Sequence, residues 1–230
     1  GKKMAVAIVG SVGAGGKNNT ADIIAIQNLL NKWITPPIAV NGICSGLPDD
    51  PTVKAIKQFQ SKYTTPDGRV DAGGGTLKRL NREPFVLLPQ MSGLGYYSYG
   101  KGNWNERQWG TKTTMEALLE IAKQYKVSYP MSQVAIGDVS FEFGGHMKPH
   151  STHQDGIHID LRPCRKDDLM LPVTYTAAEY DQAKTKILID LFLGHKNVKN
   201  ILFNDPEIYK LPRVSYYDGH HDHFHVTMLS

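Results

Sequence analysis

Apolar side chains recur at helical spacing in the first third of the chain. Residues 21–33, ADIIAIQNLLNKW, repeat them every three or four positions, and Thr20 stands where a helix N-cap is expected. Asp50, followed by a proline, predicts the start of a second helix, and a short third helix is expected over residues 76–81. Three short helices joined by long loops therefore predict a helical module over residues 20–82, after an N-terminal segment, 1–19.

The pattern changes beyond this module. Residues 83–92 contain two prolines and predict a linker. In the remaining residues, 93–230, apolar side chains recur with two different spacings. Helical spacing predicts helices over 113–127 and 177–193, and alternation predicts strands over 134–143, 157–161 and 223–228. We therefore expect an α+β fold, with the helical module followed by an α+β domain that has a central antiparallel sheet.

Composition narrows the class of protein only slightly. The chain has 230 residues, 40% hydrophobic and 21% charged, with a formal net charge of +4, which is ordinary for a globular protein. The sequence has no stripe of basic residues of the kind that would indicate a nucleic acid partner. It also has no apolar run long enough for a membrane span or a clear signal peptide. Cys44 and Cys164 lack CxxC spacing, and we expect two separate thiols.

Histidine is distributed unevenly along the chain. Eight of the nine histidines fall in two short segments, GGHMKPHSTHQDGIHID, which ends at Asp160, and DGHHDHFHV near the C-terminus. Imidazole and carboxylate groups are common protein ligands of zinc. Two segments far apart in sequence can converge to supply three ligands and leave a fourth position for water. The distribution predicts a zinc hydrolase.

The alternation of side chains along a strand predicts which of the histidines and Asp160 face the same side. Residues two apart on a strand face the same side, so His223 and His225 would share one face, as would His158 and Asp160. The apolar residues between them would enter the core. His153 lies in the turn that leads into the first of these strands, so that His153 and Asp160 can reach one metal ion.

The helical module resembles the peptidoglycan-binding domains found on many cell-wall hydrolases. The segments QNLLNKW, AIKQFQ and DGRVDAGGGTLKRL carry the resemblance over residues 20–82, and the loop between Asn41 and Asp50 departs from the family pattern. The resemblance implies peptidoglycan as a binding partner. A generic three-helix bundle is the alternative.

The histidine segments resemble the penicillin-insensitive murein endopeptidases, within a wider group of zinc peptidases that includes lysostaphin-like enzymes and D-alanyl-D-alanine metallopeptidases. HSTHQDGIHID and GHHDHFHV carry the resemblance. It implies a Zn²⁺ cofactor held by His153, Asp160 and His225, with His223 as a base or transition-state stabiliser. His150 and His220 align with histidines that line the site of that family.

Three positions depart from the pattern of that family. Pro149 replaces a glycine, His158 an acidic residue, and His221 a common aspartate. An HExxH motif is absent, which excludes the glutamate-based mechanism of thermolysin-type peptidases.

The function implied is a zinc-dependent peptidoglycan hydrolase acting in the periplasm or cell wall. Its expected activity is that of a D,D-endopeptidase, which cuts D-alanyl–meso-diaminopimelyl bonds in peptide cross-links. A D,D-carboxypeptidase and a phage endolysin are alternatives. A non-catalytic wall-binding protein with a structural zinc is an alternative of another class.

The opening SVGAGGKNNTADIIAIQ resembles the start of wall-binding modules on bacterial effectors delivered by type VI secretion. Because no signal peptide is visible, the resemblance implies an antibacterial effector exported by a dedicated system of this kind. An immunity protein would then be a further partner. A truncated chain is the alternative.

Overall fold

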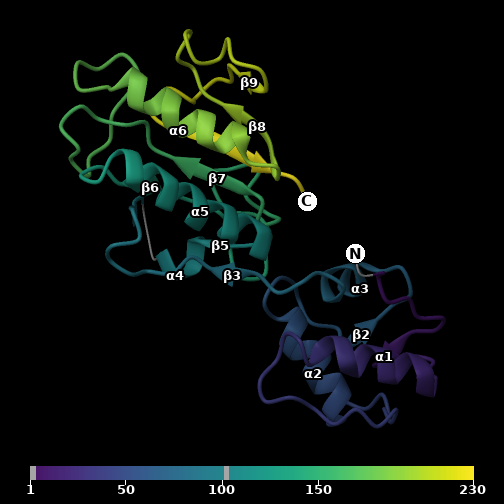
Figure 1. Ribbon diagram of the computed structural model, residues 1–230. Helices are drawn as coiled ribbons and strands as arrows, with labels where there is room; N and C mark the ends of the chain where they lie inside the picture. Colours follow the sequence, from purple (N-terminus) through teal and green to yellow (C-terminus); the bar gives the residue numbers. More distant parts are fainter. Residues whose placement is uncertain (1–3, 101–103) are drawn as a thin grey trace. The chain divides into compact units, whose positions relative to one another are not determined.

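A computed structural model describes residues 4–100 and 104–230. The chain divides into two compact units, Gly1–Pro84 and Phe85–Ser230 (Figure 1). Residues 85–88 of the expected linker belong to the second unit, where Phe85 and Leu88 are buried. Among the described residues, no helix combines the length and the apolar character that crossing a bilayer requires.

The described part of the first unit, residues 4–84, contains three helices and one two-stranded sheet. The helices are α1 (Thr20–Leu30), α2 (Pro51–Gln60) and α3 (Gly75–Leu80), and strand β1 (Val12–Gly13) pairs antiparallel with β2 (Arg69–Val70). Asp50 caps α2, because its carboxylate accepts hydrogen bonds from the backbone N–H groups of Thr52 and Val53. The small sheet was not predicted, because each of its strands is only two residues long.

Helix α1 differs at both ends from its predicted range of 21–33. Its N-cap is Asn19, and Thr20 is already its first helical residue. At the other end, the Asn31 side chain donates to the carbonyl of Ile38 and accepts from its N–H, both at 2.9 Å. These bonds turn the chain back and end the helix before residue 33.

Two buried glutamines perform the same task in the first unit. The side-chain oxygen of Gln27 accepts hydrogen bonds from the N–H groups of Asn41 and Gly42, at 2.9 and 3.0 Å. The oxygen of Gln60 likewise accepts from Asp67 and Gly68, at 3.1 and 2.9 Å. Each glutamine therefore holds a turn in which a glycine with positive φ follows an Asn or Asp.

The second unit is built on a six-stranded sheet. Its order is β4 (Tyr96–Ser98), β6 (Val134–Ile136), β7 (His158–Leu161), β10 (Phe224–Met228), β8 (Val198–Leu202) and β9 (Val214–Ser215). A separate pair joins β3 (Val86–Leu87) to β5 (Trp109–Gly110). The helices are α4 (Trp104–Arg107), α5 (Lys112–Ser128) and α6 (Gln182–Gly194).

The prediction of an antiparallel sheet is correct for the four inner strands and wrong at both edges. Strands β6, β7, β10 and β8 pair antiparallel, whereas β4 pairs parallel with β6 and β9 pairs parallel with β8. Between β4 and β6 the chain passes through α5, and a crossover of this kind returns it in the same direction. The sheet is therefore mixed.

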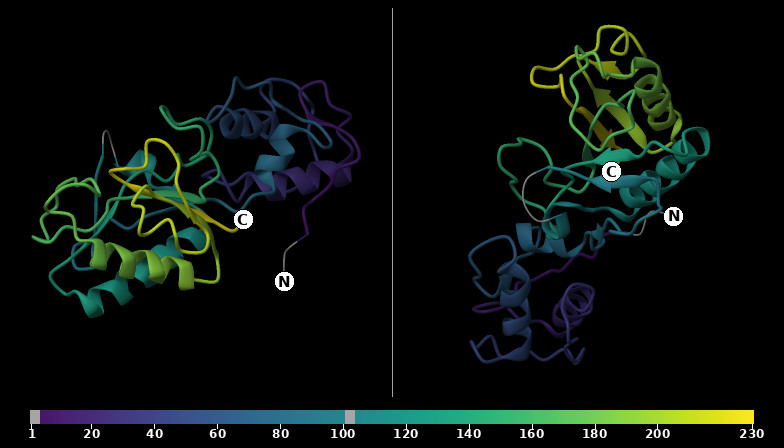
Figure 2. Two further views of the ribbon diagram at one scale, coloured as in Figure 1. Left: turned by 90° about the horizontal axis from the view of Figure 1, so that it is seen from above. Right: turned by 90° about the vertical axis from the view of Figure 1, so that its left-hand side faces the viewer.

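Helices α5 and α6 lie side by side across one face of this sheet (Figures 1 and 2). Ile159, Leu161, Phe224 and Val226 belong to the hydrophobic core on that face and have no exposed surface. The intervening residues of β7 and β10 therefore face the opposite side, which is the side that carries the polar groups.

Two predicted elements are shorter than expected. The strand expected over 134–143 ends at Ile136. Gly137 and Asp138 both hydrogen-bond to Asp160, so two residues oppose one and the regular pairing with β7 is interrupted. The helix expected over 177–193 begins only at Gln182, with Asp181 as its cap. The two cysteines are free thiols, as predicted.

Replacement of Gln27 by methionine tests the role of the buried glutamines. Methionine has a similar length but no acceptor, so the N–H groups of Asn41 and Gly42 would lose their partner. We expect the free energy of unfolding of the first unit to fall by roughly 2–4 kcal/mol, measured by amide hydrogen exchange. Gln58→Met, at an exposed position of the same unit, is the matched control. Equal protection in the two variants would contradict the assignment.

Candidate metal centre

The pairing of β7 with β10 places the two histidine segments together. His225 is directly opposite Asp160 in this ladder, and both side chains point away from the helices. The Nδ1 atom of His225 lies 2.9 Å from Oδ1 of Asp160. Asp160 and His225 are both buried.

His153 presents a bare nitrogen to the same carboxylate. Its Nδ1–H donates to the carbonyl of Val139 at 2.9 Å, because a carbonyl oxygen only accepts. In the neutral ring the lone pair is then on Nε2, which is buried and has no hydrogen-bond partner among the described residues. This atom lies 3.2 Å from Oδ2 of Asp160. Nitrogen and oxygen lone pairs therefore face each other across a short gap.

These donors fit zinc. A cation is the species that can sit between a bare imidazole nitrogen and an ionised carboxylate, and zinc prefers this combination of nitrogen and oxygen. His150, His153 and Asp160 each offer a ligand atom, and the three atoms lie within 4.8 Å of one another. His225 is a third imidazole, and it contacts the other oxygen of Asp160.

The turn that carries His153 is held by close backbone packing. His153 itself has a positive φ of 60°, a conformation that is unusual for a residue other than glycine. Gly156 follows in the same turn, and a Cβ at this position would lie 3.0 Å from the backbone of Gly110 and Thr111. The Gly156 carbonyl accepts hydrogen bonds from the Thr111 N–H and the Thr114 hydroxyl. The turn is therefore attached to the start of α5.

A second carboxylate positions His150. Asp138 accepts two hydrogen bonds from the Arg107 guanidinium, both at 2.7 Å, and its Oδ2 lies 2.8 Å from Nε2 of His150. Burial opposes ionisation of Asp138, but Arg107 and His150 lower its pKa to about 2. The hydrogen bond with Asp138 in turn raises the pKa of His150.

Electrostatics keep Asp160 ionised. Burial of this carboxylate opposes its charge, but contacts with His153 and His225 hold its pKa well below the usual range. Burial lowers the pKa of His225. Asp160 is therefore an anion surrounded by imidazoles, which is the state required of a metal ligand.

His158 contacts His225 from the side opposite Asp160. Its Nδ1 lies 2.9 Å from Nε2 of His225 and 3.2 Å from the hydroxyl of Thr227. Burial, with His225 and His153 close by, lowers the pKa of His158 to about 4, so its ring is neutral at neutral pH. A neutral His158 offers a lone pair that can accept the Nε2–H of His225.

His223 and His220 lie beside this group. Nδ1–H of His223 donates to the Asp222 carboxylate at 2.8 Å, and its Nε2 lies 3.9 Å from Oδ1 of Asp160. The His220 ring centre is 4.7 Å from that of His223. Nδ1–H of His220 is directed at the backbone carbonyls of Tyr217 and Asp218.

An open cavity of about 530 Å³ adjoins the centre. Its lining includes His150, Asp160 and His223 together with Tyr99, Arg107 and Arg162. A substrate in this cavity would therefore touch the carboxylate and two of the histidines. Of the predicted site residues, His150, His153, His223 and His225 each have a ring nitrogen within 4.0 Å of the Asp160 carboxylate, and the His220 ring lies next to those of His223 and His225.

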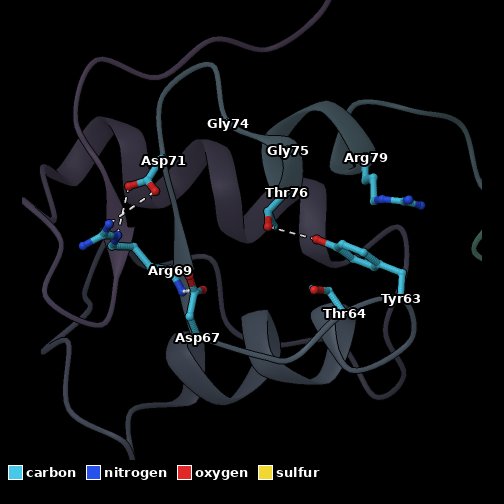
Figure 3. Close-up of a pocket in the computed structure, with 9 residues that line it drawn as sticks. All are labelled: Tyr63, Thr64, Asp67, Arg69, Asp71, Gly74, Gly75, Thr76 and Arg79. Carbon is cyan, nitrogen blue, oxygen red and sulfur yellow. Dashed lines mark hydrogen bonds and ion pairs between the residues drawn. The ribbon is translucent and has the colours of Figure 1, made fainter. Parts of the chain in front are cut away.

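A second cavity, of about 460 Å³, lies in the first unit (Figure 3). The Tyr63 hydroxyl donates to Thr76 at 2.9 Å, and the Arg79 guanidinium lies 4.2 Å from the centre of the Tyr63 ring. Asp71 pairs with Arg69 at 2.9 Å. The lining is polar and contains an aromatic ring.

Sequence patterns missed several residues of the centre. Arg107, Asp138 and Asp222 are not among the predicted site residues. The only available signal was that Asp222 is next to His223. Arg107 acts through a distant partner, and no local pattern predicts such a contact.

Buried imidazoles and a carboxylate beside an open cavity, on the polar face of an α+β sheet, define a site of the metallohydrolase class. The profile of the penicillin-insensitive murein endopeptidases matches residues 90–199. Over these residues, a little under half of the chain, the sequence is similar to the murein endopeptidases, a family of metallopeptidases. The match includes the first histidine segment and ends before the second. A comparison with curated proteins gave no match.

The contact between His158 and His225 generates a prediction on metal affinity. In His158→Ala the Nε2–H of His225 loses its acceptor, so the ring is no longer held with its other nitrogen toward Asp160. We expect the affinity for Zn²⁺ to fall roughly 10- to 100-fold, measured by competition with a chelator. His158→Gln keeps an acceptor and should recover part of the loss. His146→Ala, at an exposed position of the same segment, is the control, and an equal affinity in His146→Ala and His158→Ala would refute this role.

Proposed function

We propose that the second unit is a zinc-dependent D,D-endopeptidase that cuts D-alanyl–meso-diaminopimelyl cross-links of peptidoglycan. The observation that carries this proposal is the bare, buried Nε2 of His153, which faces the Asp160 carboxylate at 3.2 Å beside an open cavity. The family match over residues 90–199 supports murein as the substrate.

His153, Asp160 and His225 would hold the zinc and leave a fourth position for water, and His150, which lines the cavity, would contact the substrate. When bound, zinc would polarise the scissile carbonyl and lower the pKa of a water molecule to about 7. Arg107 and Asp138 keep His150 in place, and the Val139 carbonyl fixes the tautomer of His153.

His223 is the proposed catalytic base. Asp222 accepts the Nδ1–H of this ring, which leaves Nε2 unprotonated in the neutral form. His223 lines the cavity, so Nε2 can take a proton from the attacking water and pass it to the leaving amine. Asp222 thus acts as a positioning residue for His223.

One observation bears on the alternatives. The open cavity beside His150, Asp160 and His223 favours a catalytic zinc over the structural zinc of a non-catalytic wall-binding protein, since structural sites are closed by four protein ligands. The D,D-carboxypeptidase and phage endolysin alternatives use the same chemistry, and the products of digestion distinguish the carboxypeptidase from the endopeptidase.

For the first unit we propose binding of peptidoglycan. The cavity beside Tyr63 offers an aromatic ring, two guanidinium groups and hydroxyl groups to a polar polymer (Figure 3). Tethering to the wall would raise the local concentration of cross-links around the second unit.

Digestion of purified cross-linked peptidoglycan tests the proposed activity. We expect loss of dimeric muropeptides and gain of intact monomers, resolved by liquid chromatography and mass spectrometry, and a chelator should abolish the change. Loss of only a terminal alanine would instead identify a carboxypeptidase. An unchanged digest by zinc-loaded protein would contradict hydrolysis altogether.

Two variants serve as controls for that digestion. His153→Ala should lose both zinc and activity, because it removes a ligand. His223→Ala should be inactive but keep its zinc, measured by metal analysis, because its ring acts on the proton and not on the metal.

Delivery as an antibacterial type VI effector is a further proposal, supported by the resemblance of the opening segment. Expression in a target cell with an added export signal should be toxic, because the substrate lies outside the cytoplasm. Expression without that signal should be harmless, and toxicity from the cytoplasmic form would count against this role. Colony counts after induction measure both.

A further inference from the structure

Arg162 lies on the same face of the sheet as the metal centre. Its N–H donates to the Ala135 carbonyl at 3.1 Å, which extends the pairing of β7 with β6 by one residue. Side chains alternate along a strand, so Arg162 and Asp160 point to the same side, with their Cα atoms about 7 Å apart. Both side chains line the cavity of about 530 Å³.

The guanidinium of Arg162 is held without a carboxylate. It lies 4.1 Å from the centre of the Tyr99 ring, and Nη1 donates to the Tyr97 hydroxyl at 3.4 Å. In the described part of the chain, Arg162 has no carboxylate oxygen within 4.0 Å. Arg107, the other arginine of this cavity, is paired with a carboxylate, since it donates two hydrogen bonds to Asp138.

The Tyr99 ring that supports Arg162 is itself closely packed. A Cβ on Gly137 would lie only 2.7 Å from Cζ of Tyr99, so the hydroxyl end of the ring packs against Gly137 and a side chain there would displace it. Stacking on Tyr99 occupies the face of the guanidinium and leaves the N–H donors in its plane. Paired N–H donors of this kind match the two oxygens of a carboxylate.

The proposed substrate has a carboxylate where an ordinary protein chain has none. In a D-alanyl–meso-diaminopimelyl cross-link, the nitrogen of the scissile amide is attached to a carbon that also bears a free carboxylate. A terminal D-alanyl-D-alanine has the same arrangement. An internal peptide bond of a protein has another amide at this position.

We propose that Arg162 binds the carboxylate on the leaving amino acid and so restricts hydrolysis to amides that carry this group. This inference rests on the proposed function. Tyr99 is the positioning residue that holds the guanidinium toward the cavity. The chemistry is shared by the cross-link and by a terminal D-alanine, so the test includes both.

The test compares synthetic acyl-D-alanyl peptides that differ only in the leaving residue. One pair ends in the D-centre of diaminopimelate and the other in D-alanine, each as the free carboxylate and as the carboxamide. We expect zinc-loaded wild-type protein to prefer the carboxylate by roughly 10- to 100-fold in kcat/KM. In Arg162→Gln this preference should disappear, mainly through a higher KM for the carboxylate substrate.

Variants and a second measurement guard against a general loss of folding. The preference is a ratio within one protein, so partial loss of active enzyme does not change it. Arg162→Lys keeps the charge and should retain part of the preference, whereas Lys186→Gln, on the exposed surface of α6, should match the wild type. Binding of the carboxylate peptide to zinc-free protein, measured by calorimetry, should weaken to the same extent in Arg162→Gln.

The outcomes separate this inference from the proposed function. Wild-type protein that cleaves carboxylate and carboxamide equally, or Arg162→Gln that keeps the preference, would overturn the role of Arg162 and leave the peptidase activity standing. Wild-type protein that cleaves none of the four peptides would overturn both. A preference confined to the diaminopimelate pair would assign the carboxylate to the cross-link, and one confined to the D-alanine pair would assign it to a chain end.

Discussion

The register between β7 and β10 is the constraint on which the second unit depends. It sets His225 opposite Asp160 and Thr227 opposite His158, while the residues between them enter the core beneath α5 and α6. A shift of one residue would turn every side chain to the other face and bury the imidazoles among apolar groups. The fully buried Ile159 and Phe224 therefore do more than stabilise the fold. They determine which side of the sheet carries the chemistry.

Loops complete what the sheet begins. The residues after β6 hold two histidines at once, since Asp138 contacts His150 and the Val139 carbonyl contacts His153. Arg107 anchors Asp138 in turn, and Gly156 ties the histidine turn to the start of α5. Three segments separated in sequence thus converge on one carboxylate. The site has few degrees of freedom left, which is the preorganisation that a catalytic centre requires.

The sequence could predict contacts of this site between residues that are close in sequence, but not contacts between residues that are far apart in sequence. Alternation along a strand placed His158 with Asp160 and His223 with His225, because strand periodicity is local. The parallel edges of the sheet escaped prediction, since they depend on a crossover through α5 and not on any residue pattern within the strands. Arg162 was missed for a similar reason. Its role is inferred from the absence of a carboxylate partner among the described residues, and only the three-dimensional structure reveals that absence.

The buried glutamines that hold the turns of the first unit affect where its sequence can vary. The loop between Asn41 and Asp50 is held at one end by Gln27 and at the other by Asp50, which caps α2 and accepts the Ser45 N–H. Residues between these anchors can change in number and kind while the helices keep their places. The module therefore separates the part of its surface that is open to evolutionary change from the part that preserves its architecture.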